Sequence, residues 1–192
     1  ILKLNSKGEV EWQKTFGGMK DDEANSIQQT ADGGYIVAGC TKSFGSGGQD
    51  VYILKLNSKG EVEWQKTFGG KYDDVANSIQ RTTDGGYIVT GWTYSFGSGG
   101  YDAYILKLNA RGEVEWQKTF GGKYDDVANS LQQTTDGGYI VAGWTKSSGF
   151  GYEDAYILKL NARGELEWQK TFGGVDSDGA VSIQQATDGG YI

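Results

Sequence analysis

The chain has 192 residues, among them 32 glycines and no proline, and its formal net charge is −7. It contains no histidine, one cysteine and one methionine, which excludes histidine-based catalytic triads, His/Cys zinc clusters and disulfide bonds within the chain. The acidic balance argues against nucleic acid as a partner. No apolar run is long enough for a membrane helix, so we expect no membrane insertion, and this segment shows no signal-peptide pattern.

A repeat of 52 residues organises the chain from end to end. The string Glu-Trp-Gln-Lys-Thr-Phe-Gly-Gly occurs four times at this spacing, around Trp12, Trp64, Trp116 and Trp168. Asp-Gly-Gly-Tyr-Ile follows the same period from Asp32 onward, and no insertion breaks the register. One short unit has therefore been copied almost four times, which also explains the missing residue types.

Each copy predicts four short strands, which are clearest in the second copy. Residues 76–82 are polar around one isoleucine, and 87–93 and 103–109 are aromatic and β-branched. Residues 113–120 alternate apolar and polar side chains. Asp-Gly-Gly and Asn-x-(Lys/Arg)-Gly supply the positive-φ residues that tight hairpins need, and no segment has a sustained helical period.

Four antiparallel strands in a repeat of this length indicate a propeller blade. A lone four-stranded sheet cannot bury both faces, whereas blades stacked around an axis can. We therefore expect an all-β β-propeller built from 52-residue, four-stranded antiparallel blades, with about 3.7 blades in this chain. The expected parts of this single segment, 1–192, are a half-blade at 1–16 (third and fourth strands), blades at 21–68, 73–120 and 125–172, and a half-blade at 177–192 (first and second strands).

The motifs Trp-x-Lys-Thr-Phe-Gly-Gly, Asp-Gly-Gly-Tyr-Ile-Val-Ala-Gly and Asp-x-Tyr-Ile-Leu-Lys-Leu-Asn resemble repeats of secreted or surface-attached bacterial and archaeal β-propeller proteins. Their order is similar to that of quinoprotein-type blades, in which a tryptophan of the outer strand docks between neighbouring blades. The resemblance implies an extracellular or cell-surface location. It also implies that this inter-blade role falls to Trp12, Trp64, Trp116 and Trp168.

The loops before the first strand and after the second strand of each blade are expected to share one face of a propeller, which we call the loop face. Acidic and aromatic residues gather in these loops, and the candidate ligand residues are Asp73, Asp74, Tyr101, Asp102, Asp125, Asp126, Phe150 and Tyr152. Clustered carboxylates suit Ca²⁺, and neighbouring aromatic rings suit sugars. The alternative, which we favour for the aspartates, is that each one caps a turn in the same way in every copy. Asp176 and Asp178 faintly resemble a calcium loop.

Three functions remain open at this point. The first is a non-enzymatic binding or adhesion module that uses the loop face for a carbohydrate or protein ligand. The second is a structural module whose half-blades are completed by another copy of the chain or by the rest of a longer parent chain, since unpaired half-blades leave sheet edges exposed. A ring closed within one chain would have four blades, and two chains that complete each other would form eight. The third is a hydrolase or quinoprotein-like enzyme, against which the repetition argues, because an active site needs one special place with distinct acid and base environments. We expect no catalytic residues and no cofactor other than the possible Ca²⁺.

Overall fold

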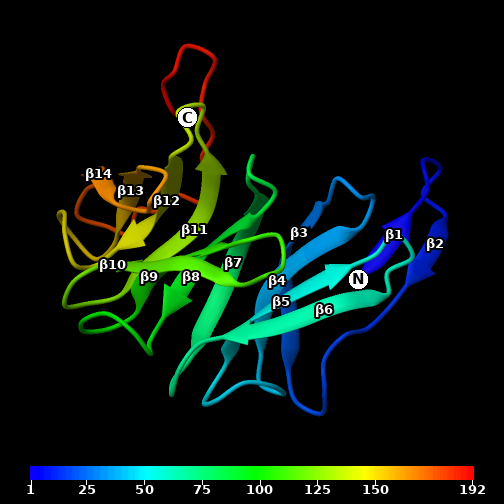
Figure 1. Cartoon of the computed structure of the whole chain (residues 1–192). Helices are drawn as coiled ribbons and strands as arrows, with labels where there is room; N and C mark the ends of the chain where they lie inside the picture. Colours follow the sequence, from blue (N-terminus) through cyan, green and yellow to red (C-terminus); the bar gives the residue numbers. More distant parts are fainter.

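The computed structural model describes residues 1–192 and consists of β-strands and turns (Figure 1). No part of the chain forms a helix that could cross a membrane. Three four-stranded antiparallel sheets follow one another along the chain, each with its strands in sequence order. The all-β fold of repeated four-stranded blades is therefore confirmed.

The first blade contains β3 (Asp22–Gln29), β4 (Tyr35–Thr41), β5 (Asp50–Leu56) and β6 (Val62–Phe68). The second contains β7 (Asp74–Arg81), β8 (Tyr87–Thr93), β9 (Asp102–Leu108) and β10 (Val114–Phe120). The third contains β11 (Asp126–Gln133), β12 (Tyr139–Thr145), β13 (Asp154–Leu160) and β14 (Leu166–Phe172). At the N-terminus, β1 (Leu2–Leu4) and β2 (Val10–Gln13) form a two-stranded sheet.

Tight turns connect the strands where the glycine pattern predicts them. Gly85 lies between β7 and β8 with φ of 85°, and Gly112 lies between β9 and β10 with φ of 71°. Such positive φ values carry little cost for glycine, which has no Cβ. The Asp-Gly-Gly and Asn-x-(Lys/Arg)-Gly motifs therefore set the hairpins that separate the strands.

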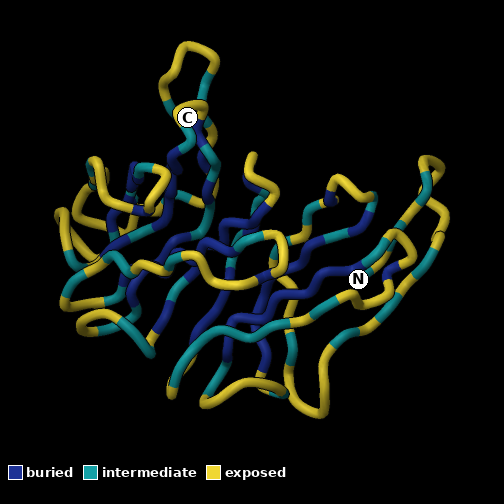
Figure 2. The backbone as a smooth tube through the Cα atoms, in the orientation of Figure 1, coloured by how far each residue is buried: buried dark blue, intermediate teal, exposed yellow.

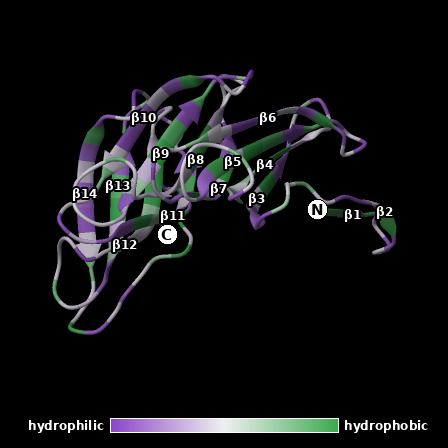
Figure 3. Ribbon diagram, turned by 90° about the horizontal axis from the view of Figure 1, so that it is seen from below, coloured by the Kyte–Doolittle hydropathy of each residue, from purple (hydrophilic) through white to green (hydrophobic).

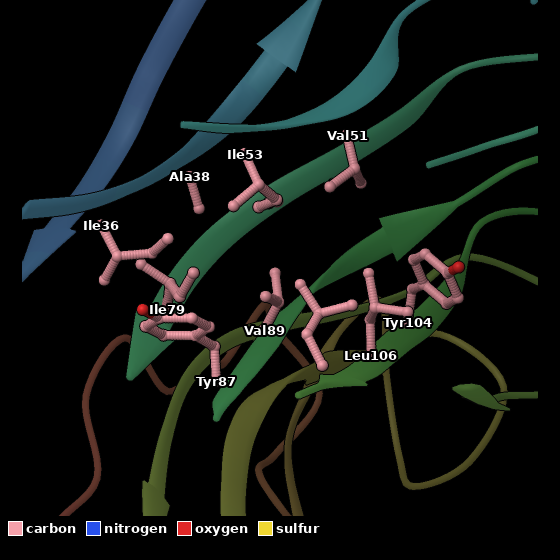
Figure 4. Close-up of a cluster of buried hydrophobic side chains, with 11 residues drawn as sticks. Ile36, Ala38, Val51, Ile53, Ile79, Tyr87, Val89, Tyr104 and Leu106 are labelled. Carbon is pink, nitrogen blue, oxygen red and sulfur yellow. The ribbon is translucent and has the colours of Figure 1, made fainter. Parts of the chain in front are cut away.

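The hydrophobic core lies between blades rather than inside a single sheet. Between the first two blades, Ile36, Ala38 and Ile53 pack against Ile79 and Val89 (Figure 4). The second and third blades pack in the same way. The tube in Figure 2 accordingly is darkest along the central strands and lightest in the turns. Each blade needs its neighbours to bury both of its faces.

A β-bulge links the innermost strands of successive blades. The register between β7 and β8 shifts between Ala76 and Ser78, which leaves Asn77 outside the ladder. The Nδ2 group of Asn77 donates to the carbonyl of Ala128 in the next blade at 3.0 Å. Asn25 and Asn129 donate in the same way to Ala76 and Ala180, at 2.9 and 3.0 Å. A side chain at Gly91, opposite the bulge, would collide with the Val75 carbonyl, so the close approach requires glycine there.

The C-terminal residues differ from the expected first and second strands of a half-blade. Residues 173–192 contain only isolated bridges, Glu153 to Ser177 and Gln185 to Tyr191. The chain reaches only Ile192 after the turn, so the second strand is too short to build a ladder. The segment nevertheless runs beside β11, where the Ile183 amide donates to Ser130 Oγ at 3.3 Å.

The blades form an open arc. In Figures 1 and 3 the N-terminal sheet lies at one end of the arc and the C-terminal segment lies toward the other. Ile1 and Phe16 pack on the first blade, and Ile183 and Tyr191 pack on the third. The two partial blades therefore cover opposite ends of the same stack.

Candidate functional site

The loop face is formed where β7 and its counterparts begin and where β8 and its counterparts end. The amide of Tyr94 donates to the Asp73 carbonyl at 2.8 Å, which ties the two loops of the second blade together. The Tyr72 amide donates to Ser95 Oγ at 2.9 Å. These bonds fix the loops that carry the predicted ligand residues.

Three of the candidate aspartates are buried and already engaged. Asp74 and Asp126 each accept from a threonine and a serine hydroxyl of their own blade and from a backbone amide. Asp102 accepts from the amide of Ser98 at 2.8 Å. All three are at most 2% exposed, so they hold loops in place and present no carboxylate to a ligand.

Asp73 and Asp125 connect neighbouring blades through one carboxylate oxygen. Asp73 Oδ1 accepts from the Gln49 amide at 2.7 Å, and Asp125 Oδ1 accepts from the Tyr101 amide at 3.2 Å. Asp125 Oδ2 also accepts from Lys146 Nζ at 3.2 Å. Asp73 is exposed and forms no such ion pair, because the counterpart of Lys146 in its blade is Tyr94.

Buried carboxylates oppose each other at each junction between blades. A Cβ placed on Gly121 would collide with carboxylate oxygens of both Asp102 and Asp126. Burial, together with the charge of Asp126, raises the pKa of Asp102, although the hydrogen bond from the Ser98 amide lowers it in part. The same cause raises the pKa of Asp50, which faces Asp74.

The remaining predicted residues lie at the end of the arc. Phe150 and Tyr152 are exposed in the loop between β12 and β13. Asp178 Oδ2 accepts from the Gly174 amide at 2.8 Å, and Asp176 is exposed. No group of three or more His, Cys, Asp or Glu side chains is placed to hold a metal ion. A calcium site at this pair stays a prediction.

The tryptophans of the outer strands lie against the following blade. The rings of Trp12 and Tyr35 are 5.7 Å apart, and Trp64 and Trp116 lie 6.2 and 5.8 Å from Tyr87 and Tyr139. Trp168 lies 5.9 Å from Tyr191 in the C-terminal segment. These contacts join strands far apart in the sequence.

Four aromatic side chains of the second blade form a continuous run, which we call the aromatic run: Tyr72, Tyr94, Tyr101 and Trp92. The ring centroids are 5.3 Å apart from Tyr72 to Tyr94, 5.4 Å from Tyr94 to Tyr101 and 4.5 Å from Tyr101 to Trp92. Tyr72 and Tyr94 are exposed, while the other two are half-buried. Of these residues only Tyr101 is among the ligand residues predicted from the sequence. The sequence does mark Tyr94, because two other copies carry lysine at that position.

The equivalents of Tyr94 in the other two blades are lysines that form ion pairs. In the third blade Lys146 stands in place of Tyr94, bonds Asp125 and Glu153, and lies 5.2 Å from the Trp144 ring. In the first blade Lys42 pairs with Asp21 at 3.2 Å. The second blade therefore places a tyrosine at the position where both other blades place a lysine in an ion pair.

Comparison with known proteins agrees with the architecture. Residues 82–115, which span β8, β9 and the start of β10, match a family described as a domain of unknown function (DUF5122) beta-propeller. The chain is a β-propeller repeat protein. Its sequence is 23% identical over 166 residues to Regulatory protein FlaEY of Caulobacter vibrioides, a match that covers 74% of this chain and 17% of that protein. The chain thus spans a small part of the length of that curated relative.

Among solved structures, the propeller resembles a protein of unknown function from Bacteroides caccae. The sequences are 16% identical, the TM-score is 0.37, and the match covers 88% of this chain and 73% of that one.

Proposed function

We propose that this β-propeller is a non-enzymatic binding module, acting at the cell surface or outside the cell, that holds a neutral carbohydrate on its loop face. The observation that carries the proposal is the aromatic run on the second blade. Tyrosine and tryptophan combine a large apolar ring with a polar group, which suits ligands that have both apolar faces and hydroxyl groups.

The surroundings of the aromatic run favour a sugar over other aromatic-binding ligands. The exposed carboxylate of Asp73 lies in the loop bonded to Tyr94 and can accept hydrogen bonds from hydroxyl groups. The net charge of −7 disfavours acidic ligands. The buried aspartates support this site by fixing the loops rather than by touching the ligand.

Binding to an array of neutral and acidic glycans tests the proposal. We expect neutral glycans to bind, and Tyr94→Ala and Tyr101→Ala to weaken binding about ten-fold, since each removes a ring from the run. Tyr124→Ala is the matched control. Tyr124 is the counterpart of Tyr72 in the next copy, is similarly exposed and has no aromatic ring beside it.

Two results would contradict this assignment. One is that no glycan on the array binds the wild-type protein. The other is that Tyr124→Ala weakens binding as much as Tyr94→Ala, which would place the ligand away from the aromatic run.

A further inference from the structure

The first blade leaves uncovered an apolar surface that every later blade buries. Ile27 on β3 is 50% exposed, whereas its counterparts Ile79 and Leu131 are 4% and 6% exposed. Ala24 is also exposed, whereas Ala76 and Ala128 are almost completely buried. Ile36 and Ala38 of the preceding blade cover Ile79, whereas residues 1–192 place no corresponding second strand beside Ile27.

A hollow of about 310 Å³ marks this place, and Ile1, Leu2, Ala24, Ile27 and Val37 line it. One side of the hollow is β1, whose outer neighbour is β2 and whose inner edge has no strand partner. In the complete blades that edge pairs with the second strand. An open strand edge beside an exposed apolar surface is a binding site for another strand.

The 52-residue repeat identifies what fits there. Residues 178–192 correspond, three repeats on, to β3 and the start of β4. Tyr191 and Ile192 thus correspond to Tyr35 and Ile36, which pair with Leu56 and Lys55. One repeat earlier, those partners are Leu4 and Lys3 of β1.

We propose that residues 178–192 of a second copy of this chain dock against β1 and β3, so that the two half-blades join into one blade shared between chains. The partner's Tyr191 and Ile192 pair with Leu4 and Lys3, and the partner's Ile192 covers Ile27. This interface is separate from the loop face and does not depend on a carbohydrate ligand.

The side-chain hydrogen bonds between the inner strands of complete blades have counterparts at the proposed shared junction. In the complete junction Ser26 Oγ accepts from the Ile79 amide at 3.2 Å, and Gln28 Oε1 accepts from the Arg81 amide at 2.6 Å. Their counterparts Ser182 and Gln184 are present in the C-terminal segment. They would accept from the amides of Ile27 and Gln29 in the other chain.

One hydrogen bond that forms in every complete junction cannot form in this shared junction. Asn25, Asn77 and Asn129 each donate to a carbonyl of the next inner strand, but the fourth counterpart is Val181. The shared junction is therefore weaker than the internal ones, and Val181 is 81% exposed. Asparagine at this position would restore the bond, here to the Ala24 carbonyl.

Sedimentation velocity over a range of concentrations tests the interface. We expect the wild-type chain to self-associate and Ile27→Glu to be monomeric with an unchanged circular dichroism spectrum, since the Ile27 side chain is half exposed in its own chain. Val62→Glu is the control, because Val62 is a similarly exposed apolar residue on the outer strand β6. Val181→Asn is expected to tighten association about five-fold, the effect of one added hydrogen bond.

Disulfide trapping distinguishes a second copy from closure within one chain. We expect Leu4→Cys and Tyr191→Cys chains, mixed after separate purification, to form a mixed disulfide dimer. The native Cys40 does not compete, because burial raises the pKa of its thiol to about 11. A wild-type chain that stays monomeric at all concentrations would overturn the proposal. So would self-association that Ile27→Glu leaves intact, or a chain carrying both cysteines that forms only an internal disulfide.

Discussion

Asp126→Asn is expected to lower the free energy of unfolding by about 3 kcal/mol, whereas Asp102→Asn is expected to raise it by about 1 kcal/mol at neutral pH. Both carboxylates are buried, and they face each other at the junction between the second and third blades. The opposite signs follow from their hydrogen bonds.

Asp126 accepts three hydrogen bonds, from Thr145 Oγ1, from Ser147 Oγ at 2.7 Å and from the Gly122 amide at 2.8 Å. An asparagine there turns one oxygen into an NH₂ group that faces donors. Asp102 accepts only from Ser98, so asparagine keeps that bond with its oxygen and can donate to Asp126 with its nitrogen. The repulsion between the two carboxylates is removed as well.

The raised pKa of Asp102 determines how the stability of the protein changes with pH. Because the pKa of Asp102 is raised in the folded state, that state holds the proton more tightly than the unfolded chain. The wild-type protein is therefore expected to gain stability as the pH falls from neutral through the folded pKa of Asp102 toward its unfolded value near 3.8. Asp102→Asn should reduce this gain. Chemical denaturation of both variants at several pH values measures the effect, and equal destabilisation by the two replacements would contradict it.

Lys107→Ala is expected to lower the free energy of unfolding by about 3 kcal/mol. Lys107 is 2% exposed, and its Nζ lies 2.9 Å from Asp84 Oδ2 and 2.8 Å from Glu115 Oε2. Alanine would leave a cavity and two unpaired carboxylates. The cost falls at the low end for a broken buried ion pair, because both carboxylates are about half exposed. Lys118→Ala, on the exposed side of β10, is the control and should change stability by less than about 0.5 kcal/mol.

Unfolding measurements at acid pH distinguish the ion pair between Lys107 and Asp84 from a contribution of Lys107 through packing alone. Burial would raise the pKa of Asp84, but hydrogen bonds from Thr82 and Lys107 outweigh it and hold the pKa at about 2. The stabilisation is therefore complete above the unfolded value of 3.8 and is lost as the pH falls toward 2. Lys107→Ala should flatten this part of the profile. A profile parallel to that of the wild type would show that the lysine acts only through its packing.

Lys107 has one contact that the strand pattern of the sequence indicates and one that it does not. The sequence places this lysine in the middle of the third strand, beside a fourth strand that carries glutamates, and the structure pairs each such lysine with one of them, at Glu63, Glu115 and Glu167. The second carboxylate, Asp84 and its counterparts, comes from a turn more than twenty residues away. Strand alternation is local, so it could not predict that contact.

The bulge at Asn77 and the aromatic run were missed for related reasons. A bulge depends on the register of two strands and on the next blade, which supplies the carbonyl that Asn77 binds. Tyr72 and Tyr94 lie in different loops, and only the packed blade brings their rings to 5.3 Å. The sequence shows that Tyr94 corresponds to Lys146, but it does not show that Tyr94 lies beside Tyr72 and Tyr101.

The sequence by itself determined the repeat, the strands, the turns and the propeller architecture, because these follow from local backbone preferences copied every 52 residues. Tertiary structure alone decided which carboxylates are buried, which rings meet and how well each copy of one isoleucine is covered. Ile27, Ile79 and Leu131 occupy the same position of the repeat, yet within residues 1–192 only the latter two are covered by a complete preceding blade. Burial depends on the neighbour and not on the residue, so identical repeats have different environments at the two ends of the arc.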